Sequence, residues 1–261
     1  MKIEKVSNYI VQWLKSYAEN AGAQGFVVGI SGGIDSAVTS TLAAKTGLPT
    51  LCIEMPIHQA PDQLTRSSTH IGQLKKAYDN VRSEFVDLSE VFNHFQNAVK
   101  ADSSNEKNDL SLGNTRARLR MSTLYYHAAI HGFLVAGTGN KVEDFGVGFY
   151  TKYGDGGVDL SPIADLLKSE VFALGRLLGI TDSILNAAPT DGLFHDSRTD
   201  EEQLGATYDE LEWAMTQSES DPADNLTQRQ LEVLKIYRSL NRANAHKMIP
   251  IPVCMIPDDL R

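Results

Sequence analysis

One short segment combines residue types that suit phosphate chemistry. Residues 25–47, GFVVGISGGIDSAVTSTLAAKTG, join an apolar run, a glycine- and serine-rich turn, and a helix-forming run. Glycines let backbone N–H groups close around phosphate oxygens, serine hydroxyls add donors, and the first turn of a helix offers free N–H groups. The segment therefore predicts an anion site at the strand-to-helix turn, formed by Ser31, Gly32, Gly33, Asp35 and Ser36.

Asp35 is the unusual member of this turn. A carboxylate next to phosphate repels it unless a divalent cation lies between them, so Asp35 indicates Mg²⁺ held jointly by protein and nucleotide. The turn is not a Walker A loop, because no Gly-Lys-Ser/Thr follows and the lysine that usually contacts the β and γ phosphates is missing. The alternative is a glycine-rich turn in which Asp35 or Ser36 caps a helix.

The phosphate turn needs a strand before it and a helix after it, and much of the chain repeats that alternation. Apolar runs at 25–30, 48–56, 81–88 and 132–139 are separated by helical patterns, at spacings that suit crossovers between parallel strands. Polar residues interrupt the run at 81–88, which fits an edge strand or a loop equally well. The pattern predicts a single α/β domain over residues 1–261, with a doubly wound, mostly parallel sheet flanked by helices.

After Leu160 the pattern becomes helical. Apolar residues recur at helix spacing in 169–179, 199–215 and 227–244, which indicates a helical C-terminal part packed around the sheet. Polar, acidic compositions predict loops at 100–111 and 216–228.

Composition excludes several classes of partner. The 261 residues carry a formal net charge of −9 and contain no block of consecutive Lys or Arg, so neither nucleic acid nor a membrane surface is expected as the main partner. The two cysteines lack metal-ligand spacing, and the N-terminal 15 residues form an amphipathic pattern rather than a signal peptide, which points to the cytoplasm. No apolar run approaches the roughly 20 residues of a membrane-spanning helix.

The sequence SGGIDS at 31–36 resembles the signature loop of the ATP pyrophosphatases, which cleave ATP between its α and β phosphates to adenylate a substrate. Their fold is the adenine-nucleotide α-hydrolase-like form of the α/β sheet. Further segments, in this order and at these spacings, are similar to the ammonia-dependent NAD synthetases of that superfamily: GNTRARLRM at 113–121, GTGNKVED at 137–144, FYTKYGDGGVDLSPIADLLK at 149–168, APTDGL at 188–193, TDEEQLG at 199–205 and AHK at 245–247. The resemblance runs over nearly the whole chain.

The helical segment at 113–121 also has a physical interpretation. Asn114 and Arg118 lie four residues apart, so one helix face would present both to a ligand, and Arg118 suits a phosphate or carboxylate. Three alternating arginines could instead form a solvated face, but a helix places Arg116 and Arg120 together and Arg118 nearly opposite. At least one of them is therefore expected to point inward beside the apolar residues of this helix, where it needs an anionic partner. The resemblance implies that this arginine is Arg118 and that its partner is deamido-NAD.

The run at 132–139 ends as the first strand does, so Thr138 and Glu143 are expected at the same sheet edge as Asp35. Two carboxylates there can share one magnesium ion; the alternative for Glu143 is a first-turn carboxylate favoured by the helix dipole. This segment departs from the commoner family pattern, which has an acidic residue where Gly139 stands. Family members also often carry a basic residue near the adenine where this chain has Glu54, so no adenine contact is assigned.

The resemblance implies a role for each matching residue. ATP is expected to contact Gly29, Ile30, Ser31, Gly32, Gly33, Ile34, Asp35, Ser36, Thr138, Lys168 and Thr190. Deamido-NAD is expected to contact Asn114, Arg118, Lys152, Asp159, His246 and Lys247. Asp35 and Glu143 would hold Mg²⁺, and with Lys168 they form the implied catalytic set. Without the resemblance, Lys168 would be interpreted as an ordinary surface lysine at a helix start. Residues 246–247 are predicted to lie past the last helix, where the alternative is a disordered terminus. The apolar run at 248–257 argues for packing there.

The implied reaction is the amidation of deamido-NAD by ammonia and ATP, through an adenylated intermediate, with release of AMP and pyrophosphate. The length leaves no room for a fused glutaminase domain, so free ammonia or a separate donor is expected. The resemblance also implies a homodimer, with the helix at 113–131 as the candidate interface. Three alternatives stay open: a GMP synthetase core, a tRNA-thiolating enzyme, and a non-catalytic module that senses ATP.

Overall fold

The four apolar runs pair as one parallel sheet in the order β3-β2-β1-β4. In this computed structural model, which describes residues 1–190, 199–218 and 226–261, the strands are β1 (Phe26–Gly29), β2 (Thr50–Glu54), β3 (Val81–Phe85) and β4 (Leu134–Val135). The interrupted run forms the edge strand β3, one of the two forms expected for it. The α/β fold class predicted from the sequence is confirmed.

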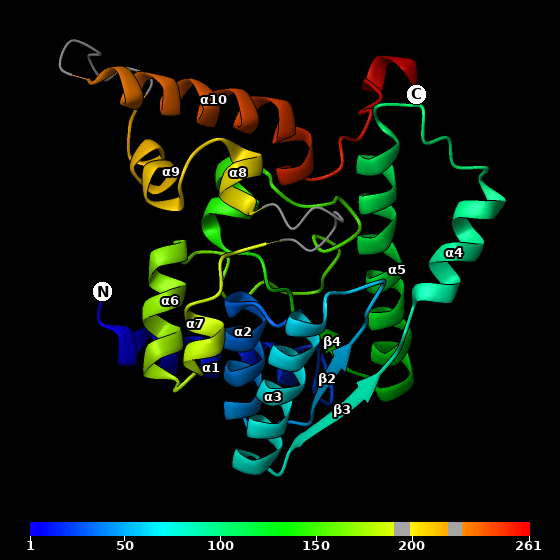
Figure 1. Ribbon diagram of the computed structural model, residues 1–261, viewed down its shortest axis with the longest axis vertical. Coiled ribbons are helices and arrows are strands. Elements are labelled where there is room, and N and C mark those ends of the chain that lie inside the picture. The colour runs from blue at the N-terminus through cyan, green and yellow to red at the C-terminus, as the bar shows by residue number, and fades with distance from the viewer. Residues whose placement is uncertain (191–198, 219–225) are drawn as a thin grey trace.

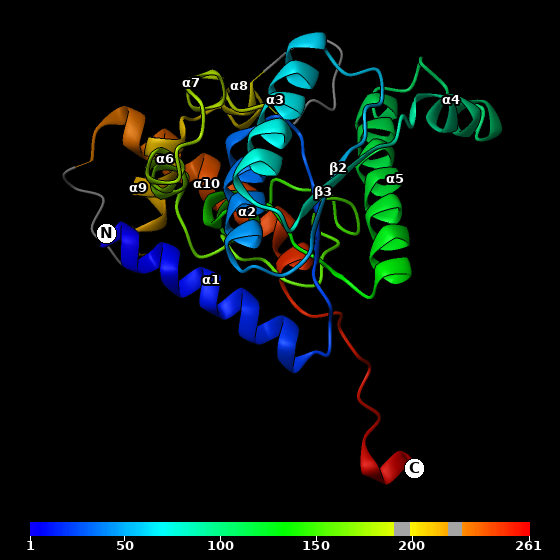
Figure 2. The ribbon, with the colours of Figure 1, turned by 90° about the horizontal axis from the view of Figure 1, so that it is seen from below.

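Helices cover both faces of the sheet, as Figures 1 and 2 show. One core contains buried residues of α1 (Ile3–Asn20), α2 (Ile34–Lys45), α3 (Pro61–Ala77) and α6 (Lys168–Leu177) together with Phe26 and Val28 of β1. The intervening Val27 faces the second core, which α4 (Ser89–Ala98) and α5 (Asn108–His131) cover. This alternation along β1 follows from the twofold side-chain period of a strand, and it makes the sheet doubly wound.

The C-terminal part is helical, as predicted. A π-helical segment (Val142–Val147), α8 (Asp200–Leu204), α9 (Tyr208–Met215) and α10 (Gln228–Met248) share a third core above the sheet edge, and the short α7 (Asp182–Leu185) packs with the first core. The chain ends in a short 3₁₀ turn (Asp258–Leu260). Within the part of the chain that the structure describes, no helix has the length and hydropathy needed to cross a membrane.

Four expectations about local structure need correction. The loop predicted at 100–111 ends early, because α5 already begins at Asn108. The helical pattern at 199–215 is two helices, since Gly205 adopts a left-handed conformation at φ 76° and ends α8. Helix α10 continues to Met248, so residues 246–247 lie in its last turn rather than beyond it. The apolar run after α10 is exposed rather than packed.

A buried histidine connects the helix of the phosphate turn to α3. His70 is 2% exposed, and its Nε2 lies 2.9 Å from the hydroxyl of Ser40, which also donates to the carbonyls of Ser36 and Ala37. Burial lowers the pKa of His70 from 6.5 to about 4. The imidazole is therefore neutral in the folded protein at pH 7 and bridges α2 and α3 without a charge.

This burial predicts acid sensitivity of the fold. The unfolded chain takes up a proton at His70 near pH 6.5 and the folded chain only near pH 4, so stability falls as the pH drops through this window. We expect a loss of about 3 kcal/mol in the free energy of unfolding at pH 4 relative to His70→Gln, measured by urea denaturation at several pH values. Exposed His131→Gln is the control, and parallel pH profiles of wild type and His70→Gln would contradict the prediction.

Candidate functional site

A cleft opens at the carboxyl ends of β1, β2 and β4, where a doubly wound sheet binds its ligands. The phosphate turn forms one wall, and the other walls come from α3, α5, the segment 136–158 and the start of α6. Every residue predicted to contact ATP lines this cleft: Gly29, Ile30, Ser31, Gly32, Gly33, Ile34, Asp35, Ser36, Thr138, Lys168 and Thr190.

The phosphate turn is held by its own hydroxyls and by close packing. The hydroxyl of Ser36 donates to the carbonyl of Gly33 at 3.0 Å, and the amide of Gly33 donates to the hydroxyl of Ser31 at 3.2 Å. Gly32 has φ 83°, and a Cβ there would lie 2.6 Å from the carbonyl oxygen of Gln63, so only glycine fits. Gly33 is the N-cap of α2, and no side chain caps the helix, which leaves its first amides for a ligand.

Lys168 is buried between the two predicted metal ligands. Its Nζ lies 2.7 Å from Oδ2 of Asp35 and 2.9 Å from Oε1 of Glu143, and the lysine is 3% exposed at the start of α6. Burial would lower the pKa of Lys168, but the charges of Asp35 and Glu143 and their hydrogen bonds outweigh it and raise the pKa above its ordinary value. This lysine is therefore not a surface residue, and it supplies the positive charge that the turn lacks.

Two uncharged side chains fix the carboxylates. The amide of Asn140, which is fully buried, donates to Oδ1 of Asp35 at 3.0 Å, and its carbonyl oxygen accepts from the backbone amides of Val142 and Glu143. The hydroxyl of Tyr208 donates to Oε1 of Glu143 at 2.6 Å. Against burial, the charge of Lys168 and the Tyr208 hydrogen bond lower the pKa of Glu143 and keep it ionised. Burial instead raises the pKa of Asp35.

A further carboxylate lies in the same cleft. Burial, together with the charges of Glu143, Asp155 and Asp35, raises the pKa of Asp144 to about 8. A Cβ built on Gly139 would lie 2.2 Å from the carboxylate oxygens of Asp144. The side chain of Asp144 therefore occupies the space beside Gly139, where the commoner family pattern carries its acidic residue.

The donor set suits magnesium held together with a nucleotide. Among the described residues, no group of three or more His, Cys, Asp or Glu side chains could hold a metal ion by itself. Mg²⁺ usually takes one or two carboxylates and completes its octahedron with substrate phosphates and water. Asp35 and Glu143, which converge on one ammonium group, offer such a pair of ligands.

The residues predicted to contact deamido-NAD do not line the cleft. Five of them form a connected set at one side of it. Oδ1 of Asn114 accepts from the hydroxyl of Thr151, and Arg118 donates to the carbonyl of Lys152 at 3.3 Å. Nζ of Lys152 donates to the carbonyl of His246 at 2.6 Å.

Lys247 completes this set and approaches the cleft most closely. Its Nζ donates to the carbonyls of Gly148 and Tyr150 at 2.8 Å, and it lines a smaller cavity that shares Gly139 and Asp144 with the cleft. Asp159 lies apart from the other five, where its oxygens accept from the hydroxyl of Tyr125 and the amide of Val135.

The arginines of α5 require a correction. One does point inward, as expected, but it is Arg116, which is 5% exposed with its guanidinium 4.5 Å from the centroid of the Phe92 ring. Arg118 is exposed on the opposite side of the helix. Arg120 lines the cleft, where it donates to the carbonyl of Met55 at 3.0 Å, and sequence reasoning had assigned it no role.

Glu54 also lines the cleft, near the end of β2. Its Oε1 accepts from the hydroxyls of Ser67 at 2.5 Å and Ser68 at 3.3 Å. The sequence analysis did not predict Asn140, Tyr208 or Arg120 as parts of the site. The one sequence feature that could have indicated any of them is the position of Asn140 within the motif GTGNKVED.

The chain matches the protein-family model described as NAD synthase over residues 6–250. It is 36% identical over 265 residues to the NH(3)-dependent NAD(+) synthetase of Syntrophomonas wolfei, with 100% of both chains covered. It is 38% identical over 261 residues to that of Alkaliphilus oremlandii, covering 96% of this chain and 97% of the relative.

Among solved structures, NMN synthetase from Francisella tularensis superposes with a TM-score of 0.84 at 31% identity, over 99% of both chains. The NH3-dependent NAD synthetase from Campylobacter jejuni superposes with a TM-score of 0.77 over 98% of this chain and 100% of that one. Its identity is 24%, so this second likeness supports the fold alone.

Proposed function

The chain belongs to the NAD synthase family, and we propose that its cleft carries out the ATP-dependent amidation of deamido-NAD with ammonia. The protein is a ligase that forms a carbon–nitrogen bond. One observation of the structure carries the assignment: Lys168 joins Asp35 and Glu143 at a glycine-rich turn whose helix amides are uncapped. NAD formation from deamido-NAD and ATP, compared between ammonium and glutamine as nitrogen source, tests it. Product with glutamine alone would contradict it.

The first step activates the nicotinate carboxylate. One of its oxygens attacks the α phosphorus of ATP, and the bond to the β phosphate breaks, giving an adenylated intermediate and pyrophosphate. The amide of Gly32, the uncapped first amides of α2 and the ammonium of Lys168 stabilise the charge on the phosphate oxygens. Asp35 and Glu143 would hold Mg²⁺, which would neutralise further phosphate charge. Asn140 and Tyr208 keep the two carboxylates in place.

The second step exchanges AMP for ammonia. The nitrogen of ammonia attacks the activated carboxyl carbon, AMP leaves with the bridging oxygen, and the nitrogen loses a proton to give the amide. No protein nucleophile takes part. We assign binding of the dinucleotide to the five residues at the side of the cleft, Asn114, Arg118, Lys152, His246 and Lys247, and to Asp159, which lies apart from them.

Loss of the Tyr208 hydroxyl is expected to weaken catalysis through Glu143. Tyr208→Phe removes the hydrogen bond that lowers the pKa of Glu143, so this carboxylate protonates at a higher pH. We expect kcat/KM to fall, and to fall more near pH 6 than at pH 8, which a pH–rate profile measures. Tyr237→Phe on α10 is the control, because its hydroxyl makes no hydrogen bond among the described residues. Equal profiles for Tyr208→Phe and wild type would contradict this role.

A second candidate substrate is the mononucleotide. The structural relative at 31% identity is named NMN synthetase, so its name points to nicotinamide mononucleotide as the product. We expect this chain to prefer deamido-NAD over nicotinic acid mononucleotide by at least about tenfold in kcat/KM, because the AMP half adds more than about 1.4 kcal/mol of binding. Competition between both substrates in one reaction measures the ratio directly. A reversed ratio would assign the chain to mononucleotide amidation.

The assignment to the NAD synthase family also bears on the oligomeric state and the cellular location of the protein. We propose a homodimer in the cytoplasm, with α5 in the interface, because Leu110, Tyr126 and Ile130 of this helix are 58–64% exposed. Sedimentation at several protein concentrations tests the dimer, and a monomer throughout would contradict it.

A further inference from the structure

One buried carboxylate of the cleft has an oxygen that no described residue satisfies. Glu54, the last residue of β2, lines the cleft and is 9% exposed. Its Oε1 accepts from the hydroxyls of Ser67 and Ser68, whereas no described residue donates to Oε2, which is not fully enclosed. Because an acceptor withdrawn from water is costly without a donor, Oε2 indicates a ligand that brings a donor into the cleft.

The cations of the cleft do not neutralise this carboxylate. Of the described residues, three basic side chains line the cleft, and each has another partner. Arg66 pairs with Asp62 at 2.7 Å, and Arg120 donates to a backbone carbonyl at 3.0 Å. Lys168 lies between the two predicted metal ligands. Glu54 forms no ion pair with any of the three, so it offers a ligand an uncompensated negative charge.

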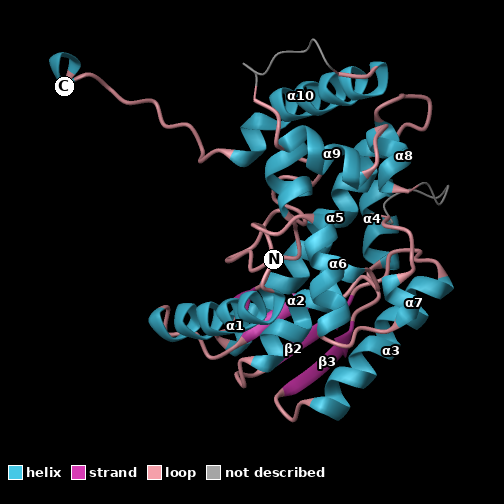
Figure 3. Cartoon of the chain, turned by 90° about the vertical axis from the view of Figure 1, so that its left-hand side faces the viewer, coloured by secondary structure: helices cyan, strands magenta, loops and turns pink. Residues whose placement is uncertain are grey.

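Helix α3 fixes the orientation of this carboxylate. Figure 3 shows α3 alongside β2 and β3, and Ser67, on the side of α3 that faces the sheet, is buried. The same helix packs against the phosphate turn, where a Cβ on Gly32 would lie 2.6 Å from the carbonyl oxygen of Gln63. One helix therefore holds Glu54 at a fixed place relative to the turn.

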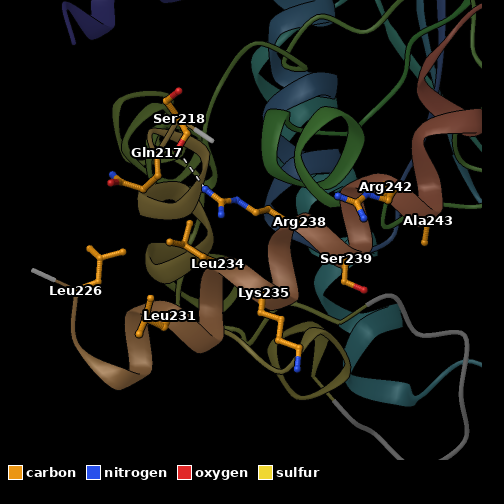
Figure 4. A pocket seen from close by; sticks show the side chains of 10 residues that line it. All are labelled: Gln217, Ser218, Leu226, Leu231, Leu234, Lys235, Arg238, Ser239, Arg242 and Ala243. Carbon is orange, nitrogen blue, oxygen red and sulfur yellow. Dashed lines mark hydrogen bonds between the residues drawn. The ribbon is translucent and has the colours of Figure 1, made fainter. Parts of the chain in front are cut away.

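The strand register places Glu54 next to the phosphate turn. Strands β1 and β2 are parallel, and Gly29 at the end of β1 pairs with Ile53, directly before Glu54. Neighbouring strands lie only about 4.8 Å apart, so a nucleoside whose phosphates bind at the turn can extend over the end of β2. The described residues that line the groove beside α10 (Figure 4) include none that line the cleft. We therefore place the nucleoside within the cleft itself.

The surroundings of Glu54 suit a flat base better than a sugar. Met55, Met121 and Leu124 line the cleft on the same side as Gly29. A Cβ on Gly29 would lie 3.2 Å from Cε of Met55 and 3.5 Å from Cδ1 of Leu124, so these side chains cover the end of β1 with an apolar surface. A purine has apolar faces and a polar edge, and this arrangement offers an apolar surface with one acceptor beside it.

We propose that Glu54 selects ATP by accepting a hydrogen bond from the 6-amino group of adenine. An ionised carboxylate can only accept, and the 6-amino group is the donor on that edge of the base. A purine without this group leaves Oε2 unpaired in the cleft, and a site built around a hydrogen bond rejects a ligand that lacks it. The inference rests on the proposed function only in taking ATP as the ligand of the cleft.

Two nucleotides isolate the amino group. Purine riboside triphosphate lacks only the 6-amino group of ATP, and 2′-deoxy-ATP lacks only a ribose hydroxyl. Calorimetry with Mg²⁺ and without deamido-NAD measures the dissociation constant of each, so the result does not depend on turnover. We expect the wild-type protein to bind ATP at least about tenfold more tightly than purine riboside triphosphate, as for a hydrogen bond to a charged group.

Variants of Glu54 then assign this preference. Glu54→Ala is expected to reduce it to less than about threefold, and it leaves the hydroxyl of Ser67 a partner, since that hydroxyl lies 3.0 Å from the carbonyl of Leu64. Glu54→Gln keeps the shape and an acceptor, so an intermediate preference is expected. Glu84→Ala is the control, because Glu84 is exposed on β3, opposite Ile53 of β2.

The ratio of the two dissociation constants separates selection of the base from a structural role. Equal weakening of ATP and purine riboside triphosphate by Glu54→Ala, or equal binding of both by the wild-type protein, would overturn the proposal. Loss of a preference for ATP over 2′-deoxy-ATP instead would assign Glu54 to the ribose and also overturn it. The expected ratios in a protein that forms no NAD would support the role of Glu54 and reject the proposed function.

Discussion

Asp35→Asn is expected to lower kcat by about 10²- to 10³-fold, the range observed when one charge-stabilising group is removed from an active site. Asparagine keeps the shape of the side chain but removes the negative charge that Lys168 contacts at 2.7 Å and that a magnesium ion would require. Steady-state formation of NAD and AMP measures the loss. Asp79→Asn, at the exposed turn before β3, is the control and should keep full activity.

The same variant separates an enzyme from a module that only senses ATP. Binding of ATP without magnesium, followed by calorimetry, is expected to change little, because we assign direct contact with the phosphates to the turn amides and the contact of Asp35 to the magnesium ion. If Asp35→Asn turned over deamido-NAD at the wild-type rate, the joint role of Asp35 and Glu143 would be wrong.

Lys168→Met is expected to affect both stability and catalysis. It leaves Asp35 and Glu143 buried side by side with no opposing charge, and breaking a buried ion pair in this way costs about 3–5 kcal/mol. Removing the ammonium group from the phosphates also lowers kcat by about 10²-fold or more. Thermal unfolding and steady-state kinetics measure the two effects, with the half-exposed Lys141→Met as the control.

Magnesium provides a specific signature for Lys168→Met. Two uncompensated carboxylates attract a divalent cation more strongly, so added Mg²⁺ should raise the melting temperature of the variant more than that of wild type. Equal responses to Mg²⁺ would show that Asp35 and Glu143 do not hold the ion together. Lys168→Arg keeps the charge and should retain more stability than Lys168→Met.

Local sequence was sufficient to predict which residues of the phosphate turn line the cleft. The phosphate turn depends on residues a few positions apart, and the parallel sheet brings Thr138 and Glu143 to the same edge as Asp35 through a rule of topology. The resemblance also predicted Lys168 among the residues at ATP, and Lys168 does line the cleft. Its burial could not be read from composition, because a lone lysine at a helix start is ordinarily exposed.

The other side of the site depends on contacts between distant segments. Helix periodicity separated Arg116 from Arg118, but only the packing of Phe92 from α4 decides that Arg116 is buried. Tyr208 reaches Glu143 from 65 residues away, and Asn140 reaches Asp35 from 105. The C-terminal end of α10 was predicted too early in the sequence. No helix breaker precedes Pro250, so the helix continues through His246.

Transfer of oxygen from substrate to AMP tests the central claim most directly. Deamido-NAD with ¹⁸O at both carboxylate oxygen positions is incubated with the protein, ATP, Mg²⁺ and ammonium. Mass spectrometry then measures the ¹⁸O content of the NAD and AMP that form. Attack of the carboxylate on the α phosphorus predicts NAD and AMP in equal amounts, each with one ¹⁸O atom. Unlabelled AMP, or ADP in its place, would contradict the adenylated intermediate and with it the proposed function of the cleft.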